Sequence, residues 1–85
     1  MVTKTLASAA YPRYPGGAVA VTPSDTINLT NPAIIYVGVA GTVKVLTVQG
    51  EETSFVGVLG GGTVPVEVIR VYATGTTATY MVAVY

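Results

Sequence analysis

Turn-forming residues interrupt this chain at short, regular intervals, and this spacing constrains the fold more than any other feature. From Ala18 onward, runs rich in Val, Thr and Tyr are separated by Gly, Pro, Asn and Asp residues at intervals of roughly ten residues. No apolar periodicity of the helical kind lies between these turns. Such spacing is typical of antiparallel sandwiches and barrels and argues against βαβ units. We therefore predict an all-β fold, a small antiparallel β-sandwich or jelly-roll-like domain over residues 18–85.

The turn signals also predict the individual strands. We expect them at residues 18–22, 26–29, 34–39, 42–48, 53–59, 63–73 and 79–85. Gly50 can supply the positive φ that a hairpin turn between 42–48 and 53–59 requires. Pro65 lies inside the longest run and has no backbone N–H, so that strand is expected to be an edge strand or to carry a β-bulge.

The predicted strands do not alternate cleanly between apolar and polar residues. In residues 42–48, Val43 and Val45 face one way, and Lys44, Leu46 and Val48 face the other. In residues 63–73, one face holds Val64, Val66, Val68, Arg70 and Tyr72, and the other holds Pro65, Glu67, Ile69 and Val71. Because a sandwich covers only the inner faces of its sheets, apolar outer faces require a neighbour or another segment of the chain.

The composition favours assembly. The 85-residue chain has four basic and four acidic side chains, so its net charge is zero and only 9% of its residues are charged, against about 25% in ordinary soluble domains. Low charge with neutrality promotes association. The chain has no Cys or His, so the disulfides and common metal sites that stabilise other small domains are excluded. We expect oligomerisation with copies of itself, as a ring or a trimer; a single ordinary small core is the alternative.

Other features exclude several functional classes. The chain has no basic surface for nucleic acid and no polybasic run for anionic lipid. Its longest uncharged stretch, residues 26–43, is interrupted by Asn, Pro and Gly, so we do not expect it to form a membrane-spanning helix. Glu51 and Glu52 are adjacent and point to opposite faces of a strand, which suits a solvated hairpin tip better than a catalytic pair. Residues 60–62 are Gly-Gly-Gly, but a predicted strand follows them, not the Lys and helix of a phosphate loop. We predict no catalytic, cofactor or metal site, and no enzyme.

Residues 1–17 differ in texture from the rest of the chain. The sequence Tyr-Pro-Arg-Tyr-Pro-Gly-Gly at 11–17 favours extended conformations. We interpret residues 1–17 as an extended N-terminal arm, which can span at most about 60 Å. Aromatic and Arg residues are typical contact anchors, so the candidate interface residues are Tyr11, Arg13, Tyr14 and, at the end of the chain, Tyr85.

Several short sequences resemble small virion proteins of tailed bacteriophages, in particular the head spike base family of phages and gene transfer agents. They are Val-Thr-Pro-Ser-Asp-Thr at 21–26, Ile-Tyr-Val-Gly at 35–38, Val-Pro-Val at 64–66, Ala-Thr-Gly-Thr-Thr-Ala at 73–78 and Val-Ala-Val-Tyr at 82–85. The resemblance covers residues 21–85 and implies an all-β protein made in the host cytoplasm and attached to the outer surface of the capsid. It implies decoration or cementing of the shell, or the base of a head spike.

The partners implied are the major capsid protein, copies of the chain itself and, where one is attached, a spike or fibre protein. Two alternatives stay open at this point. One is a β-module of a phage tail or baseplate. The other is a module that binds carbohydrate on the host surface, which would present Tyr rings coplanar on one exposed face.

Overall fold

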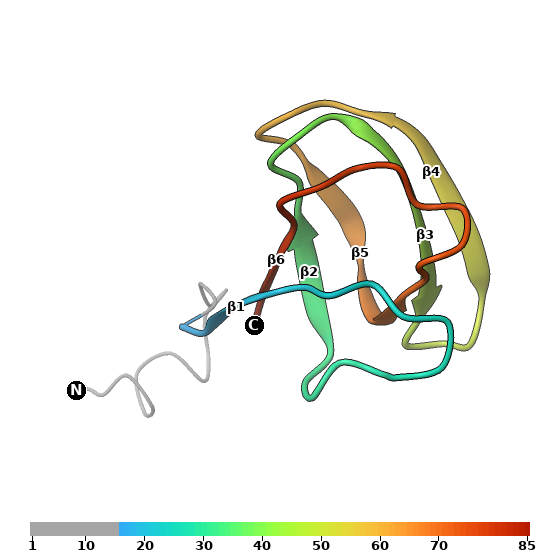
Figure 1. Cartoon of the computed structure of the whole chain (residues 1–85). Coiled ribbons are helices and arrows are strands. Elements are labelled where there is room, and N and C mark those ends of the chain that lie inside the picture. Colours follow the sequence, from blue (N-terminus) through green and yellow to red (C-terminus); the bar gives the residue numbers. More distant parts are fainter. Residues whose placement is uncertain (1–15) are drawn as a thin grey trace.

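The computed structural model describes residues 16–85, which form six β-strands and no helix (Figure 1). The predicted antiparallel all-β domain is confirmed. The strands are β1 (Ala18–Ala20), β2 (Ala33–Tyr36), β3 (Gly41–Thr47), β4 (Glu52–Val58), β5 (Thr63–Val71) and β6 (Val82–Val84). They form one sheet in the order β1-β6-β2-β5-β3-β4, and every strand pair is antiparallel. Figure 1 shows this sheet strongly curved, in an open, barrel-like shape.

One apolar core lies on the inner side of the curved sheet. Its buried members are Ala33, Ile35, Val37, Val43, Val45, Val64, Val68, Val71, Ala78, Met81 and Ala83. The two faces predicted for residues 42–48 are confirmed in β3, because Val43 and Val45 are buried whereas Lys44 and Leu46 are half-buried. The β-branched side chains that the pleated surface favours therefore supply most of the core.

β5 shows how one extra residue reverses the side-chain pattern. It lies between β2 and β3, so it is an interior strand, and the edge strand is excluded as the explanation of Pro65. The expected β-bulge is present, because Leu46 pairs with Arg70 whereas Thr47 pairs with Val68. The extra residue makes Val71 face the core together with Val68, which corrects the predicted assignment of Val71 to the opposite face.

The strand expected at residues 26–29 is absent, and this prediction is wrong. Residues 21–32 form a long connection between β1 and β2. The hydroxyl oxygen of Ser24 accepts hydrogen bonds from the backbone N–H groups of Thr26 and Ile27, at 3.2 and 3.0 Å. Such local bonds hold the backbone in a turn and compete with a strand ladder.

Candidate functional site

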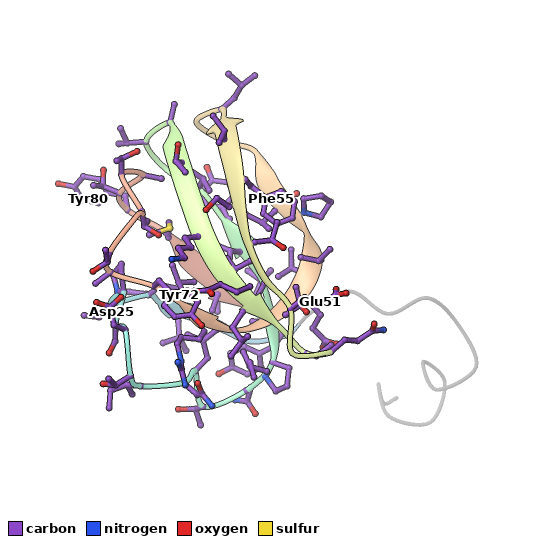
Figure 2. The ribbon with its side chains drawn as sticks, turned by 90° about the vertical axis from the view of Figure 1, so that its right-hand side faces the viewer. Asp25, Glu51, Phe55, Tyr72 and Tyr80 are labelled. Atoms are coloured by element: carbon purple, nitrogen blue, oxygen red, sulfur yellow. The ribbon has the colours of Figure 1, made fainter. Side chains whose placement is uncertain are left out.

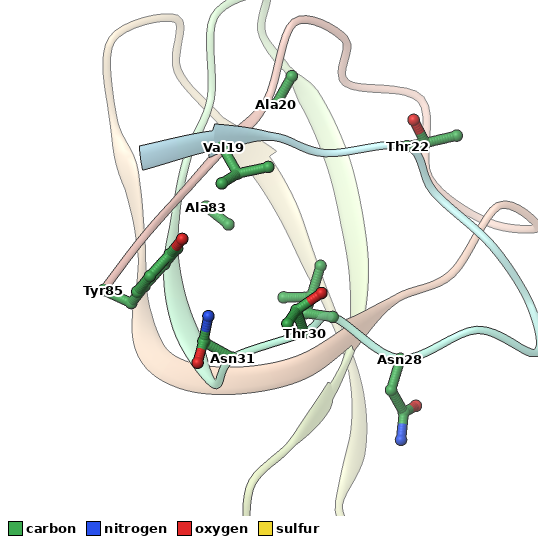
Figure 3. Close-up of a pocket in the computed structure, with 9 residues that line it drawn as sticks. Val19, Ala20, Thr22, Asn28, Thr30, Asn31, Ala83 and Tyr85 are labelled. Atoms are coloured by element: carbon green, nitrogen blue, oxygen red, sulfur yellow. The ribbon is translucent and has the colours of Figure 1, made fainter. Parts of the chain in front are cut away.

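The rim of a surface hollow contains Tyr85, the one candidate interface residue that lies in the described part of the chain (Figure 3). This hollow, which we call the C-terminal hollow, has a volume of about 320 Å³. Its lining residues come from β1, from the connection that follows it and from the end of the chain: Val19, Ala20, Thr22, Asn28, Leu29, Thr30, Asn31, Ala83 and Tyr85. The hollow holds no charged side chain, so its chemistry suits an apolar or neutral polar group.

A close approach between Gly17 and Tyr85 fixes the edge of this hollow. The Gly17 N–H donates to the Tyr85 carbonyl at 2.7 Å, and the Tyr85 N–H donates to the Gly17 carbonyl at 3.0 Å. A Cβ atom on Gly17 would lie 2.5 Å from Cε2 of the Tyr85 ring. Glycine therefore lets the ring lie against the backbone, and Tyr85 remains 41% exposed.

The other three candidate interface residues, Tyr11, Arg13 and Tyr14, lie outside the described residues. Residue 16 is the first described position and precedes β1. The chain thus enters the sheet at the edge formed by β1, beside Tyr85.

The opposite edge of the sheet is formed by β4. Most of its residues are exposed, and Val56 is 81% exposed. Phe55 and Val58 pack partly against the core, so β4 is anchored from one side. β4 therefore presents an apolar, weakly charged edge of the kind that proteins usually cover.

A second exposed apolar surface brings together three connecting segments, and we call it the apolar end. Tyr80 is 81% exposed and Leu59 is 74% exposed, and Val39 is also exposed. Backbone bonds join these segments, because the Val39 N–H donates to the Thr79 carbonyl at 2.9 Å and the Gly61 N–H donates to the Val37 carbonyl at 2.7 Å. Figure 2 shows Tyr80 projecting from the domain.

Tyr80 has a backbone conformation that is unfavourable for an L-residue with a side chain. Its φ is +55°, whereas the other described residues with positive φ are glycines. Its carbonyl accepts a hydrogen bond from the Gly38 N–H at 3.0 Å, and a Cβ on Gly38 would lie 2.7 Å from the Tyr80 Cβ. Strain held at an exposed aromatic residue points to a contact role for its ring.

The hydrogen-bonded polar groups of the described chain serve a structural role. Asp25 accepts bonds from the Thr74 N–H at 2.9 Å and from the Thr74 hydroxyl at 2.7 Å, which ties the 21–32 connection to the turn after β5. These bonds, that of the backbone N–H foremost, lower the pKa of Asp25 below its usual value. Arg70 donates to the Asn28 side chain at 2.7 Å and to the Asp25 carbonyl at 3.2 Å.

Lys44 and Arg70 both lie near the ring of Tyr72. The Lys44 Nζ is 5.2 Å and the Arg70 Cζ is 5.5 Å from the ring centroid, within the range of cation–π attraction. Lys44 also forms an ion pair of 3.2 Å with Glu52. Both basic side chains of residues 16–85 are thus engaged in local contacts.

The described acidic side chains do not gather into a metal-binding cluster. Within residues 16–85, no group of three or more Asp, Glu, His or Cys residues could hold a metal ion. Glu51 and Glu52 are exposed near the hairpin, as expected. Gly60 lies close to the Gly38 carbonyl, because a Cβ added to Gly60 would be 3.0 Å from that oxygen. The strand β5 follows the glycine run, so a phosphate-loop helix is absent there. Among the same residues, no helix has the length and apolarity to cross a membrane.

Sequence reasoning missed Val56, Leu59 and Tyr80 as candidate contact residues. Val56 lies in a strand whose position at the sheet edge is set by the overall topology. Leu59 precedes the glycine run at residues 60–62, and the sequence alone does not indicate that this connection leaves Leu59 exposed. The strained φ of Tyr80 leaves no signature in the sequence.

Comparison with known proteins defines the class to which this arrangement points. No family model matches the chain, and no curated protein matches it. A solved structure does, and the likeness supports a virion structural protein. That structure is described as the capsid of a native gene transfer agent (GTA) particle computed with C5 symmetry. The match has 28% sequence identity and a TM-score of 0.76, and it covers 99% of this chain and 100% of the other.

Proposed function

We propose that this protein is a structural component of a phage-type particle that decorates or cements the capsid or forms the base of a head spike. The observation that carries this proposal is the match to a chain of the GTA capsid, at 28% identity and over 99% and 100% of the two chains. Two chains that match over their full length, with a TM-score of 0.76, are expected to perform similar structural work. The function proposed is passive, and the protein is not an enzyme.

The physical properties of the described residues support this function. A particle component needs surface that is stable only when covered by a neighbour. The open edge at β4, the exposed apolar end around Tyr80 and Leu59, and the C-terminal hollow beside Tyr85 are three such surfaces. The low charge of the chain, 9% of its residues, offers little hydration to oppose association.

We propose that copies of the chain form a closed ring on the outer surface of the shell, in contact with the major capsid protein. Tyr11, Arg13, Tyr14 and Tyr85 are the proposed contact residues, with residues 1–17 acting as the arm and residues 18–85 as the folded domain. A spike or fibre protein would bind the outward face of this ring.

A module that binds carbohydrate is the second candidate, favoured by the lining of the C-terminal hollow. Tyr85 supplies an aromatic ring there, and Asn28 and Asn31 supply amides. Binding of glycans by the purified chain, lost on Tyr85→Ala, would support this function. A tail or baseplate module is also structural and differs only in position on the particle.

The decisive experiment is to purify particles from cells that produce them and to measure their content by quantitative mass spectrometry and electron cryo-microscopy. We expect a fixed number of copies per particle, located at symmetric positions on the shell. If the chain is present in the cell lysate and absent from purified particles, the proposal is wrong. Density in the tail would instead favour the tail or baseplate function.

A further inference from the structure

β4 has an open backbone edge. The Thr47 N–H donates to the Glu51 carbonyl at 2.8 Å, and the register pairs Val45 with Thr53 and Lys44 with Ser54. Because hydrogen-bonded and non-bonded pairs alternate along an antiparallel ladder, the N–H and C=O groups of Glu52 and Ser54 point away from β3. β4 ends the strand order of the described chain, so these groups face an unfilled position.

This edge is able to accept another strand. β4 contains no Pro, and its one charged residue, Glu52, lies at its first position. The irregularity in the β3–β4 register lies between Gly41 and Val43, where Gly57 has a φ of +76°, so the first half of β4 stays regular. The exposed Val56 offers apolar surface to a strand laid beside β4.

The distribution of charge identifies a candidate for that strand. Residues 16–85 contain two basic and four acidic side chains, a net charge of −2. The other two basic residues, Lys4 and Arg13, are both in residues 1–15, which contain no acidic residue and therefore carry +2. Equal and opposite charges on the two parts favour contact between them.

Of the three acidic side chains without an ion pair among the described residues, Asp25 is bound by Thr74, and the other two lie beside the start of β4. Glu51 and Glu67 line a hollow of about 290 Å³ together with Thr47, Val48, Gln49 and Val66. Lys44 is engaged by Glu52, and Arg70 by Asn28. A basic residue from outside the described domain would find two carboxylates at this end of the edge.

We propose, on the basis of the assembly proposed above, that residues 1–15 of one copy bind along the open β4 edge of the next copy, with Lys4 close to Glu51 and Glu67. Residues 2–6, Val-Thr-Lys-Thr-Leu, are rich in β-branched side chains and contain no Pro, so they suit the added strand. The segment precedes β1, at the other end of the strand order from β4, and it spans up to about 50 Å. Such a head-to-tail contact generates a ring when its rotation closes, as the proposed ring requires.

The first test joins Lys4 to its neighbour chemically. The full-length chain is prepared in unlabelled and ¹⁵N-labelled forms, mixed, and treated with a carbodiimide, which links an amine to a nearby carboxylate as an amide. We expect peptides that join Lys4 to Glu51 or Glu67 and that combine both isotopes. Peptides linked within one isotope alone would show that residues 1–15 fold back on their own domain, and would overturn the proposal.

The second test blocks the edge. Ser54→Pro removes an outward N–H and places a ring against the incoming strand, whereas the matched control Ser54→Ala keeps the N–H. Sedimentation equilibrium is expected to show association weakened by about tenfold or more for Ser54→Pro and nearly unchanged for Ser54→Ala. Circular dichroism checks that both variants are folded. Equal association of the two folded variants would overturn the proposal.

Charge reversal provides the third test. Lys4→Glu is expected to weaken association by about fivefold, and the added change Glu51→Lys is expected to restore part of it. An unaffected Lys4→Glu variant would contradict the assigned contact. If the chain is found in particles but these variants assemble normally, only the assignment of the β4 edge fails, and the proposed function stands.

Discussion

The strained backbone of Tyr80 leads to a prediction in which a more flexible residue stabilises the fold. In the left-handed region a residue with a Cβ is disfavoured by roughly 1–2 kcal/mol relative to Gly. Tyr80 has a φ of +55° and is 81% exposed, so loss of its ring costs little packing. Gly adds about 0.5–1 kcal/mol of unfolded-state entropy. We expect Tyr80→Gly to be more stable than Tyr80→Ala by about 0.5–1 kcal/mol.

The comparison of the two variants isolates the strain, because both lack the ring and differ only in the Cβ. For a domain of this size, a change of 1 kcal/mol moves Tm by about 4–8 °C. Thermal and urea unfolding, followed by circular dichroism at one fixed protein concentration, should place Tyr80→Gly several degrees above Tyr80→Ala. If Tyr80→Ala melts at the same temperature or higher, the backbone at this position stores no strain. Should Tyr80→Gly also fail to join particles, the ring is retained for contact at the expense of stability.

Three further predictions concern packing and titration. Gly41→Ala should destabilise the fold by about 1–3 kcal/mol in urea unfolding, because the new Cβ would lie 2.6 Å from the Ala78 backbone nitrogen; no change would mean that the loop moves freely. Ile35→Ala should cost about 2–5 kcal/mol in the same assay, since Ile35 is fully buried, and a smaller loss would indicate a core that collapses around the cavity. Because folding lowers the pKa of Asp25, the ionised carboxylate stabilises the fold above its unfolded pKa, near 4, and this stabilisation is lost as pH falls through the folded pKa. Thermal melts of the wild type should therefore lose more stability between pH 6 and about pH 2–3 than those of Asp25→Asn, and parallel losses would contradict this role.

Local chemistry was enough to predict the class of fold and several of its details. The turn at Gly50 is present, with a φ of +88°, because a tight hairpin needs a left-handed residue that Gly supplies. The inward side chains of β3 follow from alternation alone. The bulge in β5 was expected from Pro65, although the strand is interior.

The errors had one local cause and two causes that depend on how the whole sheet is assembled. Residues 26–29 have strand-forming composition, but Ser24 satisfies their backbone locally and Leu29 makes one isolated bond to Ile69. Val71 changed face because the extra residue in β5 depends on its pairing with two different neighbours. The candidate contact surfaces were hardest to foresee, because exposure of Val56 depends on which strand ends the sheet.

The pairing of Gly17 with Tyr85 has a consequence for engineering. The polypeptide enters and leaves the domain on adjoining backbone positions. A reporter or epitope fused after Tyr85 would emerge where residues 1–15 depart, and would crowd them. Display on a particle would therefore be better served by an insertion at an internal turn than by a fusion after Tyr85.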